Sequence, residues 1–244
     1  MSTEWEGPAV VLAARPHGDA NMVVTLLSEA LGRHAGLARG GQSRAQIAIW
    51  QPGNLVDARW VARLSDQLGA LSAEVVHPAA SLAMEDALAL ATLAAACAVA
   101  DGALPERVAH PLAFQGLVRV VVALARDTAQ GLEALIRWEA ALLAELGYGL
   151  DLAACAVTGA VDDLAWVSPR TGRAVSAMAG EPYSARLLAL PGFLLGEAPA
   201  GPADWLAGLK LTGHFLERDA FGHLHRPLPP ARLMLLDRVT GLVG

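Results

Sequence analysis

Lysine and cysteine are both scarce in this chain of 244 residues. Lys210 is the only lysine among 18 basic residues, so arginine carries almost all of the positive charge. Cys97 and Cys155 lie in different segments, and neither belongs to a CxxC pair. Isolated cysteines of this kind indicate buried thiols in a reducing compartment rather than a disulfide framework or a metal site.

The chain also lacks a long hydrophobic run. The longest uncharged apolar run in its middle, residues 87–100, has 14 residues between Asp86 and Asp101. A membrane span needs about 20 residues, so this run predicts a buried core helix. The N-terminal sequence MSTEWEGPAVV has neither the positive region nor the cleavage motif of a signal peptide. We therefore expect a cytoplasmic protein with no membrane association.

Familiar catalytic motifs are absent as well. The sequence contains no GxxxxGK[ST] phosphate loop, no GxSxG elbow, no HExxH and no GxGxxG. One polar run resembles a metal site, although its spacing matches no standard one and such a run just after a helix is more often a solvated turn. Its members are His214, Glu217, Asp219, His223 and His225. The sequence therefore favours a binding protein over an enzyme, with a metal-dependent hydrolase as the weaker alternative.

Negative charge is missing from one stretch of a chain whose net charge is −6. No carboxylate occurs between Glu29 and Asp57. The basic residues within this gap are Arg33, His34, Arg39 and Arg44. A basic surface on a small β module, close to an aromatic such as Trp50 or Trp60, is typical of proteins that bind phosphate backbones and stack bases. The alternative is that the arginines are scattered on solvated strands and that at least one tryptophan belongs to the core.

Residues before Pro78 have the pattern of short strands separated by turn residues. We expect these strands at residues 9–14, 22–28, 32–38, 54–64 and 71–76. Five short strands in about 75 residues predict a small closed or partly closed barrel.

After Pro78 the apolar residues recur with helical period. We expect helices at residues 83–100, 112–125, 131–146, 183–188, 203–217 and 231–239, and an irregular or small-sheet insert at about residues 151–179. Trp138, Leu142, Leu143 and Leu146 follow helical spacing, which indicates core packing. The predicted fold class is α+β, with a barrel domain at residues 1–78 and a mostly helical domain at residues 79–244.

The order of several segments resembles the RecO family of bacterial recombination mediators, and the resemblance covers nearly the whole chain. These segments are AVVLAARPHGDANMVVTLLSEALGRHAGLARGG, QPGNLVDARWVARL, LGALSAEVV, WEAALLAELGYGLDLAACAVTG, VSPRTGRAVS and LTGHFLERDAFGHLHRPLPPAR. The resemblance implies an N-terminal OB-fold barrel followed by a helical domain. It also implies a protein that binds single- and double-stranded DNA and anneals complementary strands. With RecR, such a protein displaces single-strand binding protein and loads RecA, and no cofactor is implied.

Family members bind DNA through basic residues around the third barrel strand. The matching positions here are Arg33, Arg39 and Arg44, with Arg15, Arg59, Arg63 and His34 as further candidates. Arg39, within GLARG, is the preferred single residue.

The family also contacts the acidic tail of single-strand binding protein through its helical part. An acidic amphipathic peptide needs a hydrophobic pocket with arginines at its rim. The basic residues of the helical middle are Arg107, Arg119, Arg126 and Arg137. Alternatively, they pair with Glu106, Asp127, Glu133 and Glu139 on solvated helix faces. A barrel-plus-helix adaptor without DNA affinity, suggested by the net negative charge, is a further alternative.

The sequence departs from the family at the insert. Many members carry two CxxC pairs there, which would bind a structural zinc ion. Here Cys155 is retained, Thr158 stands at its partner position, and the second pair falls in AVSAMAG, which has no cysteine. One thiolate cannot hold zinc, so we expect a zinc-finger-like insert without a metal.

Overall fold

A long first strand, β1 (Thr3–His17), organises the N-terminal part of the computed structural model. Its first half pairs with β4 (Leu55–Ala62), and its second half pairs with β2 (Asn21–Ser28). A register shift between Val11 and Ala13 lies where the strand passes from one partner to the other. Irregularities of this kind bend a strand, and barrels use them to close. The structure describes residues 3–64, 67–196 and 200–244.

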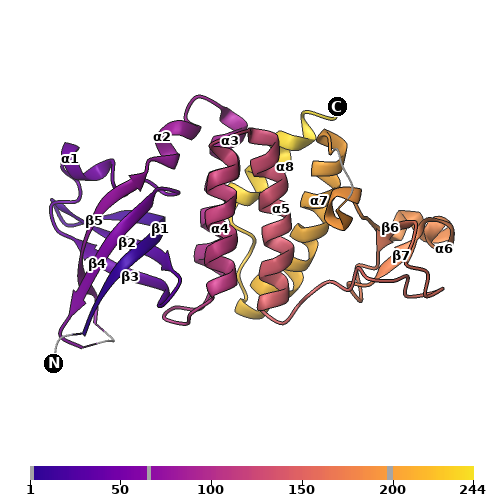
Figure 1. Ribbon diagram of the computed structural model, residues 1–244, viewed down its shortest axis with the longest axis horizontal. Helices are drawn as coiled ribbons and strands as arrows, with labels where there is room; N and C mark the ends of the chain where they lie inside the picture. Colours follow the sequence, from indigo (N-terminus) through magenta and orange to yellow (C-terminus); the bar gives the residue numbers. More distant parts are fainter. Residues whose placement is uncertain (1–2, 65–66, 197–199) are drawn as a thin grey trace. The chain divides into compact units, whose positions relative to one another are not determined.

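Two further strands close the barrel (Figure 1). β3 (Gly32–Ala38) pairs antiparallel with β2 and parallel with β5 (Gly69–His77), which pairs antiparallel with β4. Among the described residues the strand order is β1-β2-β3-β5-β4 in a closed barrel, the OB-fold architecture. The expected strands are confirmed, although β1 is longer than residues 9–14 because its first half pairs with β4.

Both tryptophans of the suspected stacking site lie in the barrel core. Trp50 is 1% exposed and Trp60 is 2% exposed. Gly69 allows β5 to pass Trp60, because a Cβ atom at residue 69 would lie 2.4 Å from the indole ring. The hypothesis that Trp50 or Trp60 stacks on bases is therefore wrong for this structure, since neither ring face reaches the surface.

Three helices follow the barrel: α2 (Ala79–Ala83), α3 (Ala87–Ala103) and α4 (Pro111–Leu124). The expectation of one helix over residues 83–100 is wrong at its start. Asp86 ends the connection between α2 and α3 and caps α3, because its carboxylate accepts hydrogen bonds from the backbone amides of Leu88 and Ala89. Short helix α1 (Arg44–Ile47) lies in the loop between β3 and β4.

Chain packing divides the protein into two units, residues 1–131 and 132–244. The division falls after α4 because α3 contacts β1 and α4 contacts β2. The domain boundary expected at residue 78, where the sequence pattern changes from strand to helix, remains a prediction.

The second unit is built on α5 (Thr128–Glu145), which begins just before the division, together with α7 (Pro202–Phe215) and α8 (Pro230–Thr240). Trp138, Leu142 and Leu143 are buried, as their helical spacing predicts. A 3-10 turn (Gly192–Leu195) precedes α7, and a π-helical turn (Leu216–Phe221) and a 3-10 turn (Gly222–Leu224) connect α7 to α8. Within the described part of the chain, no helix has the length and apolar character needed to cross a membrane.

The insert contains a small antiparallel sheet in the order β7-β6-β8. Its elements are β6 (Leu164–Val167), β7 (Ala174–Ser176), α6 (Ala177–Gly180), a 3-10 helix (Glu181–Arg186) and β8 (Leu188–Ala189). The helix expected at residues 183–188 is a 3-10 helix that ends at Arg186, so the expectation is wrong at its C-terminal end. The 3-10 helix buries none of its side chains, and Leu188 pairs with Val167 as part of the sheet.

Candidate nucleic-acid interface

A groove of about 540 Å³ is formed by residues of β3, β4, β5 and the loop that follows β3. It is lined by Leu37, Arg39, Gly40, Ser43, Gln46, Arg59, Val61, Ala70, Leu71 and Ser72. The groove brings together two candidate arginines, Arg39 after β3 and Arg59 on β4. Arg44 lies beside it on α1, between the lining residues Ser43 and Gln46.

Two amide side chains hold the loop that carries Arg39 and Arg44. The Gln42 Nε2 group donates to the carbonyl oxygens of Gly18 (2.9 Å) and Asn21 (2.8 Å). The Asn21 Oδ1 atom accepts from the backbone amide of Gly40 at 3.1 Å. These bonds fix the loop to the turn between β1 and β2. Neither amide stands out in the sequence, where the one signal is that each lies close to a turn: Gln42 follows Gly40-Gly41, and Asn21 comes soon after Gly18.

Buried Asn54 fixes the other end of the same loop. Its Nδ2 group donates to the carbonyl oxygens of Ala48 (2.9 Å) and Ile49 (3.2 Å), and its Oδ1 atom accepts from the amide of Ala80 (3.1 Å). A buried amide with its hydrogen bonds made favours one arrangement, because breaking any of them leaves a buried polar group unsatisfied. Asn54 therefore positions the loop between β3 and β4 against α2.

Three candidate arginines are exposed and make no ion pair or side-chain hydrogen bond within the described residues: Arg39, Arg44 and Arg63. Arg59 differs, because its Nε atom lies 2.5 Å from Glu4 Oε1. The hydrogen bond to Glu4 raises the pKa of the Arg59 guanidinium above its ordinary value. The free positive charge of the barrel is thus concentrated on the β3–α1 loop and the end of β4.

Arg33 and Arg15 face a different partner. The Arg33 Nη1 atom donates to Asp101 Oδ1 at 3.1 Å, and its Nε atom donates to the Leu104 carbonyl at 2.9 Å. Arg15 Nη2 lies 3.9 Å from Asp101 Oδ2. The Arg33 side chain is 21% exposed and joins β3 to the end of α3, so its charge is paired and two of its donors are already engaged within the protein.

His34 lies at the edge of the barrel core. Its ring meets Trp60 edge to face with centroids 4.5 Å apart, and both ring nitrogens are buried with no hydrogen-bond partner among the described residues. Burial, and then the positive charge of Arg107, lower the pKa of His34, while Glu106 opposes the shift. His34 is therefore neutral at neutral pH and adds no positive charge to the groove.

An acidic concavity borders the groove. It has a volume of about 350 Å³ and is lined by Glu6, Asp57, Arg59 and Glu74 among others. Asp57 and Glu74 are paired positions of β4 and β5. Arg59 lines both hollows and marks the boundary between the basic and the acidic surface of the barrel.

The arginines expected at a partner surface have different environments. Arg107 and Arg137 make two of the ion pairs considered from the sequence, with Glu106 (3.6 Å) and Glu133 (3.2 Å). Arg119 and Arg126 are exposed on and just after α4. The interpretation of Glu139 as a residue on a solvated face is wrong, because Glu139 is fully buried and binds Arg232.

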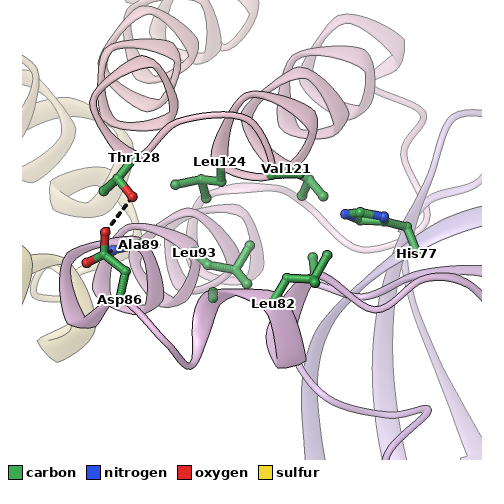
Figure 2. Close-up of a pocket in the computed structure, with 11 residues that line it drawn as sticks. His77, Leu82, Asp86, Ala89, Leu93, Val121, Leu124 and Thr128 are labelled. Carbon is green, nitrogen blue, oxygen red and sulfur yellow. Dashed lines mark hydrogen bonds between the residues drawn. The ribbon is translucent and has the colours of Figure 1, made fainter.

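A small apolar pocket of about 80 Å³ lies between α2, α3 and α4 (Figure 2). Leu82, Leu93 and Val121 contribute to its wall. His77 stands at one end, where its Nε2 atom is buried without a hydrogen-bond partner among the described residues. At the other end the Thr128 hydroxyl donates to Asp86 Oδ2 at 2.5 Å. No arginine lines this pocket.

The donors of the insert do not fit a tetrahedral zinc ion, which takes four cysteine or histidine ligands. Cys155 is buried, and its Sγ atom accepts a hydrogen bond from the Ser176 amide at 3.2 Å. Hydrogen bonds from Thr158 and Ser176 lower the pKa of the Cys155 thiol to about 6, and burial opposes this shift. The side chains around this one thiol that interact with it are the hydroxyls of Thr158 and Ser176, which do not replace the thiolates that zinc would need.

The suspected metal cluster near the C-terminus is dispersed. His214 Nε2 lies 3.0 Å from the Pro169 carbonyl, Asp219 pairs with Arg218, and the His223 ring stacks on Tyr148. Across residues 3–64, 67–196 and 200–244, no three histidine, cysteine, aspartate or glutamate side chains are grouped to hold a metal ion. The geometry therefore gives the metal-dependent hydrolase alternative no support.

A closed OB-fold barrel followed by helices defines the architectural class of the protein, and comparison with known proteins assigns the family. Residues 1–79 match the family model "Recombination protein O N terminal", and residues 84–227 match "Recombination protein O C terminal". The DNA repair protein RecO of Granulibacter bethesdensis is 57% identical over 241 residues, covering 98% of this chain and 96% of the relative. The proteins of the same name from Gluconacetobacter diazotrophicus (57% over 244 residues, 98% and 96% covered) and Acidiphilium cryptum (56% over 241 residues, 97% and 96% covered) are similarly close. The chain belongs to the RecO family of DNA repair proteins, a family of recombination mediators.

Proposed function

We propose that the protein is a DNA-binding recombination mediator that grips phosphates with the barrel groove. In this proposal it binds single- and double-stranded DNA, anneals complementary strands and, with RecR, helps RecA load onto DNA coated with single-strand binding protein. It acts in the cytoplasm at the nucleoid, by binding and without catalysis or a cofactor. The observation that carries the proposal is the set of exposed barrel arginines without an internal partner among the described residues, Arg39, Arg44 and Arg63.

Counterion release supplies the binding free energy in this mechanism. Each phosphate that meets an arginine releases condensed cations, so affinity falls as salt rises and depends little on base sequence. Arg39 and Arg44 are ranked first because their side chains give up no internal ion pair on meeting DNA. Arg33, Arg15 and Arg59 are ranked lower because each has a carboxylate within 4 Å, at distances of 3.1, 3.9 and 2.5 Å.

The acidic concavity limits the path of the strand. Glu6, Asp57 and Glu74 would repel phosphates, so the strand follows the β3–α1 loop rather than the outer face of β4 and β5. With Trp50 and Trp60 buried, phosphate contacts rather than base stacking account for affinity, which predicts weak sequence preference.

A salt titration of a fluorescein-labelled single-stranded oligonucleotide, followed by anisotropy, tests this proposal. Arg39→Ala and Arg44→Ala should each weaken binding and each lower the salt slope by about 0.7, the value for one phosphate contact on a single strand. Arg238→Ala removes the same charge from an exposed position on α8 and serves as the matched control. We call the proposed DNA-binding surface around Arg39 and Arg44 the DNA face. Unchanged affinity and salt slope in both barrel variants would overturn the assignment of this surface. Absence of DNA binding by the wild type at low salt would favour the adaptor alternative.

Strand annealing tests the mediator role separately. Complementary oligonucleotides coated with single-strand binding protein should anneal faster with the wild-type protein than without it, and more slowly with Arg39→Ala. A second assay measures RecA filament formation on coated DNA with and without RecR. If the wild-type protein binds DNA but has no effect in these two assays, the mediator role is rejected and the proposed DNA-binding surface is not.

For the acidic tail of single-strand binding protein, we propose the helical part, with Arg107, Arg119, Arg126 and Arg137 as candidate contacts. The apolar wall of the pocket in Figure 2 could bind the hydrophobic end of such a tail. Arg126 directly follows Ala125, which lines this pocket. Ala125→Phe would fill the exposed mouth of the pocket, and Arg126→Ala would remove the basic residue that directly follows Ala125. Both should weaken binding of a labelled tail peptide, whereas Arg39→Ala should not. Unchanged peptide binding in both variants would reject this pocket.

A further inference from the structure

A second hollow, in the insert, has the opposite charge from the barrel groove. It has a volume of about 550 Å³, which lies within the range of ligand and side-chain pockets. Asp163 and Glu181 line it, and within the described residues neither carboxylate makes an ion pair. Two unpaired carboxylates beside one hollow create a local negative potential that attracts cations and repels phosphates.

The remaining wall of this insert cleft is apolar. Trp166 and Met178 line it together with the small residues Ala165 and Ala177. Met178 is 80% exposed, which is a high exposure for an apolar thioether side chain that lines a hollow together with an indole. Exposed methionines are typical of surfaces that adapt to a binding partner.

Backbone contacts hold the cleft in shape. The Ala177 amide donates to the Asp163 carbonyl at 2.8 Å, and Asp163 adopts a left-handed conformation with φ of 55°. Gly180 lies against the Trp166 ring, since a Cβ atom at residue 180 would come within 2.3 Å of the indole Cδ1 atom. The indole and the backbone of Asp163 are therefore held by β6 and α6 rather than left to a free loop.

We propose that the insert cleft is a docking site for a protein segment that presents an arginine or lysine side chain flanked by apolar residues. The aliphatic stem of such a side chain packs along Met178 and Trp166, where a cation is also attracted to the indole face. Its charged head reaches Asp163 and Glu181, which have no internal cationic partner within the described residues. This role goes beyond DNA binding, because the two carboxylates of the cleft repel a phosphate backbone.

A short fluorescein-labelled peptide of alternating leucine and arginine, added to the full-length protein, tests the proposal. The control peptide carries citrulline at each arginine, which keeps the shape of the side chain and removes its charge. The wild type should bind the arginine peptide about tenfold more tightly than the citrulline peptide, as expected for two exposed ion pairs. Equal affinity for the two peptides, or no saturable binding, would overturn the proposal.

Variants connect the binding to the cleft. The double variant Asp163→Asn, Glu181→Gln should lose about tenfold in affinity for the arginine peptide, since both changes keep side-chain size and asparagine tolerates a left-handed backbone. Asp162→Asn, an exposed neighbour that does not line the cleft, is the matched control and should stay within about twofold. A loss of about threefold in the control, the share expected for one of two equivalent charges, would show that net charge, not the cleft, drives binding.

Two further readouts distinguish the insert cleft from the DNA face and from self-association. Arg39→Ala should leave peptide binding unchanged, and the double variant should keep wild-type DNA affinity. The proposal for the cleft and the proposal for the DNA face can therefore be rejected separately. Sedimentation of the protein alone should show the same mass for the wild type and the double variant. Self-association that the double variant abolishes would identify a second copy of this chain as the occupant and overturn the proposal of a separate partner.

Discussion

Arg232 and Glu139 lie 93 positions apart in the sequence and form a doubly hydrogen-bonded ion pair inside the second unit. Arg232 Nε donates to Glu139 Oε1 at 2.6 Å, and Nη2 donates to Oε2 at 3.0 Å. The two side chains are 1% and 0% exposed. Arg232 also donates to the Leu209 carbonyl, and the Thr212 hydroxyl donates to Glu139. This network joins α5, α7 and α8.

Breaking this pair on one side should strongly destabilise the protein. Arg232→Met leaves the Glu139 carboxylate buried without its cation, which costs about 3–5 kcal/mol. Urea unfolding measures the loss. The double variant Arg232→Met, Glu139→Leu should recover most of it, because no uncompensated charge remains in the core. A double variant as unstable as the single one would show that packing rather than charge explains the effect.

Substitution of Arg33 should lower stability, whereas substitution of Arg39 should weaken DNA binding. Arg33→Met leaves Asp101 and the Leu104 carbonyl without their donor, so we expect a loss of about 1–3 kcal/mol in unfolding free energy and an unchanged salt slope. Arg39→Met should stay within about 0.5 kcal/mol of the wild type in stability and lower the salt slope by about 0.7. The reverse pattern would mean that Arg33, not Arg39, meets the phosphates.

His34 should make stability depend on pH in the acid range. The pKa of His34 is lowered in the folded protein by burial and by Arg107, so the unfolded chain binds its proton more readily. Stability from the neutral ring is therefore present above the unfolded pKa of about 6.5 and is lost as pH falls through the lower folded value. His34→Leu should flatten the decline in unfolding free energy below pH 6.5. Identical pH profiles would show that other groups cause the decline.

Gly32 should tolerate no side chain. Its φ is 66°, and a Cβ atom there would lie 1.8 Å from the Val108 carbonyl oxygen. We expect Gly32→Ala to cost at least about 2 kcal/mol, from backbone strain together with displacement of the chain after α3. Gly18→Ala, with a similar φ of 62° but no atom within 4 Å, is the matched control for strain alone. Equal losses in thermal unfolding would exclude a contribution from the contact.

Chelation should leave the insert unaffected. Because Cys155 is accompanied by Thr158 and Ser176 rather than by thiolates, we expect no zinc in elemental analysis and an unchanged unfolding midpoint after treatment with EDTA. Zinc at one ion per chain, or a midpoint that falls on chelation, would contradict this prediction.

Local patterns in the sequence predicted the barrel strands and the helices α4, α5, α7 and α8, because side-chain periodicity reflects which face each element buries. Two local assignments failed at element ends. Helix α3 starts at Ala87, after the Asp86 cap, rather than at residue 83. The helix expected to reach Leu188 ends at Arg186, because Leu188 pairs with a strand of the insert sheet. Neither feature alters the periodicity of the surrounding residues.

The sequence by itself determined the family, the succession of strands and helices, and the gap in negative charge around Arg39. Tertiary structure alone decided which charges in and near that gap are free. Asp101, 68 residues after Arg33, engages that arginine, whereas Arg39 reaches no carboxylate among the described residues. In the same way, Glu139 is buried because Arg232 folds against it, and Trp50 and Trp60 are buried because the barrel closes around them. These outcomes depend on contacts between segments that are distant in the sequence, and short-range sequence patterns do not predict such contacts.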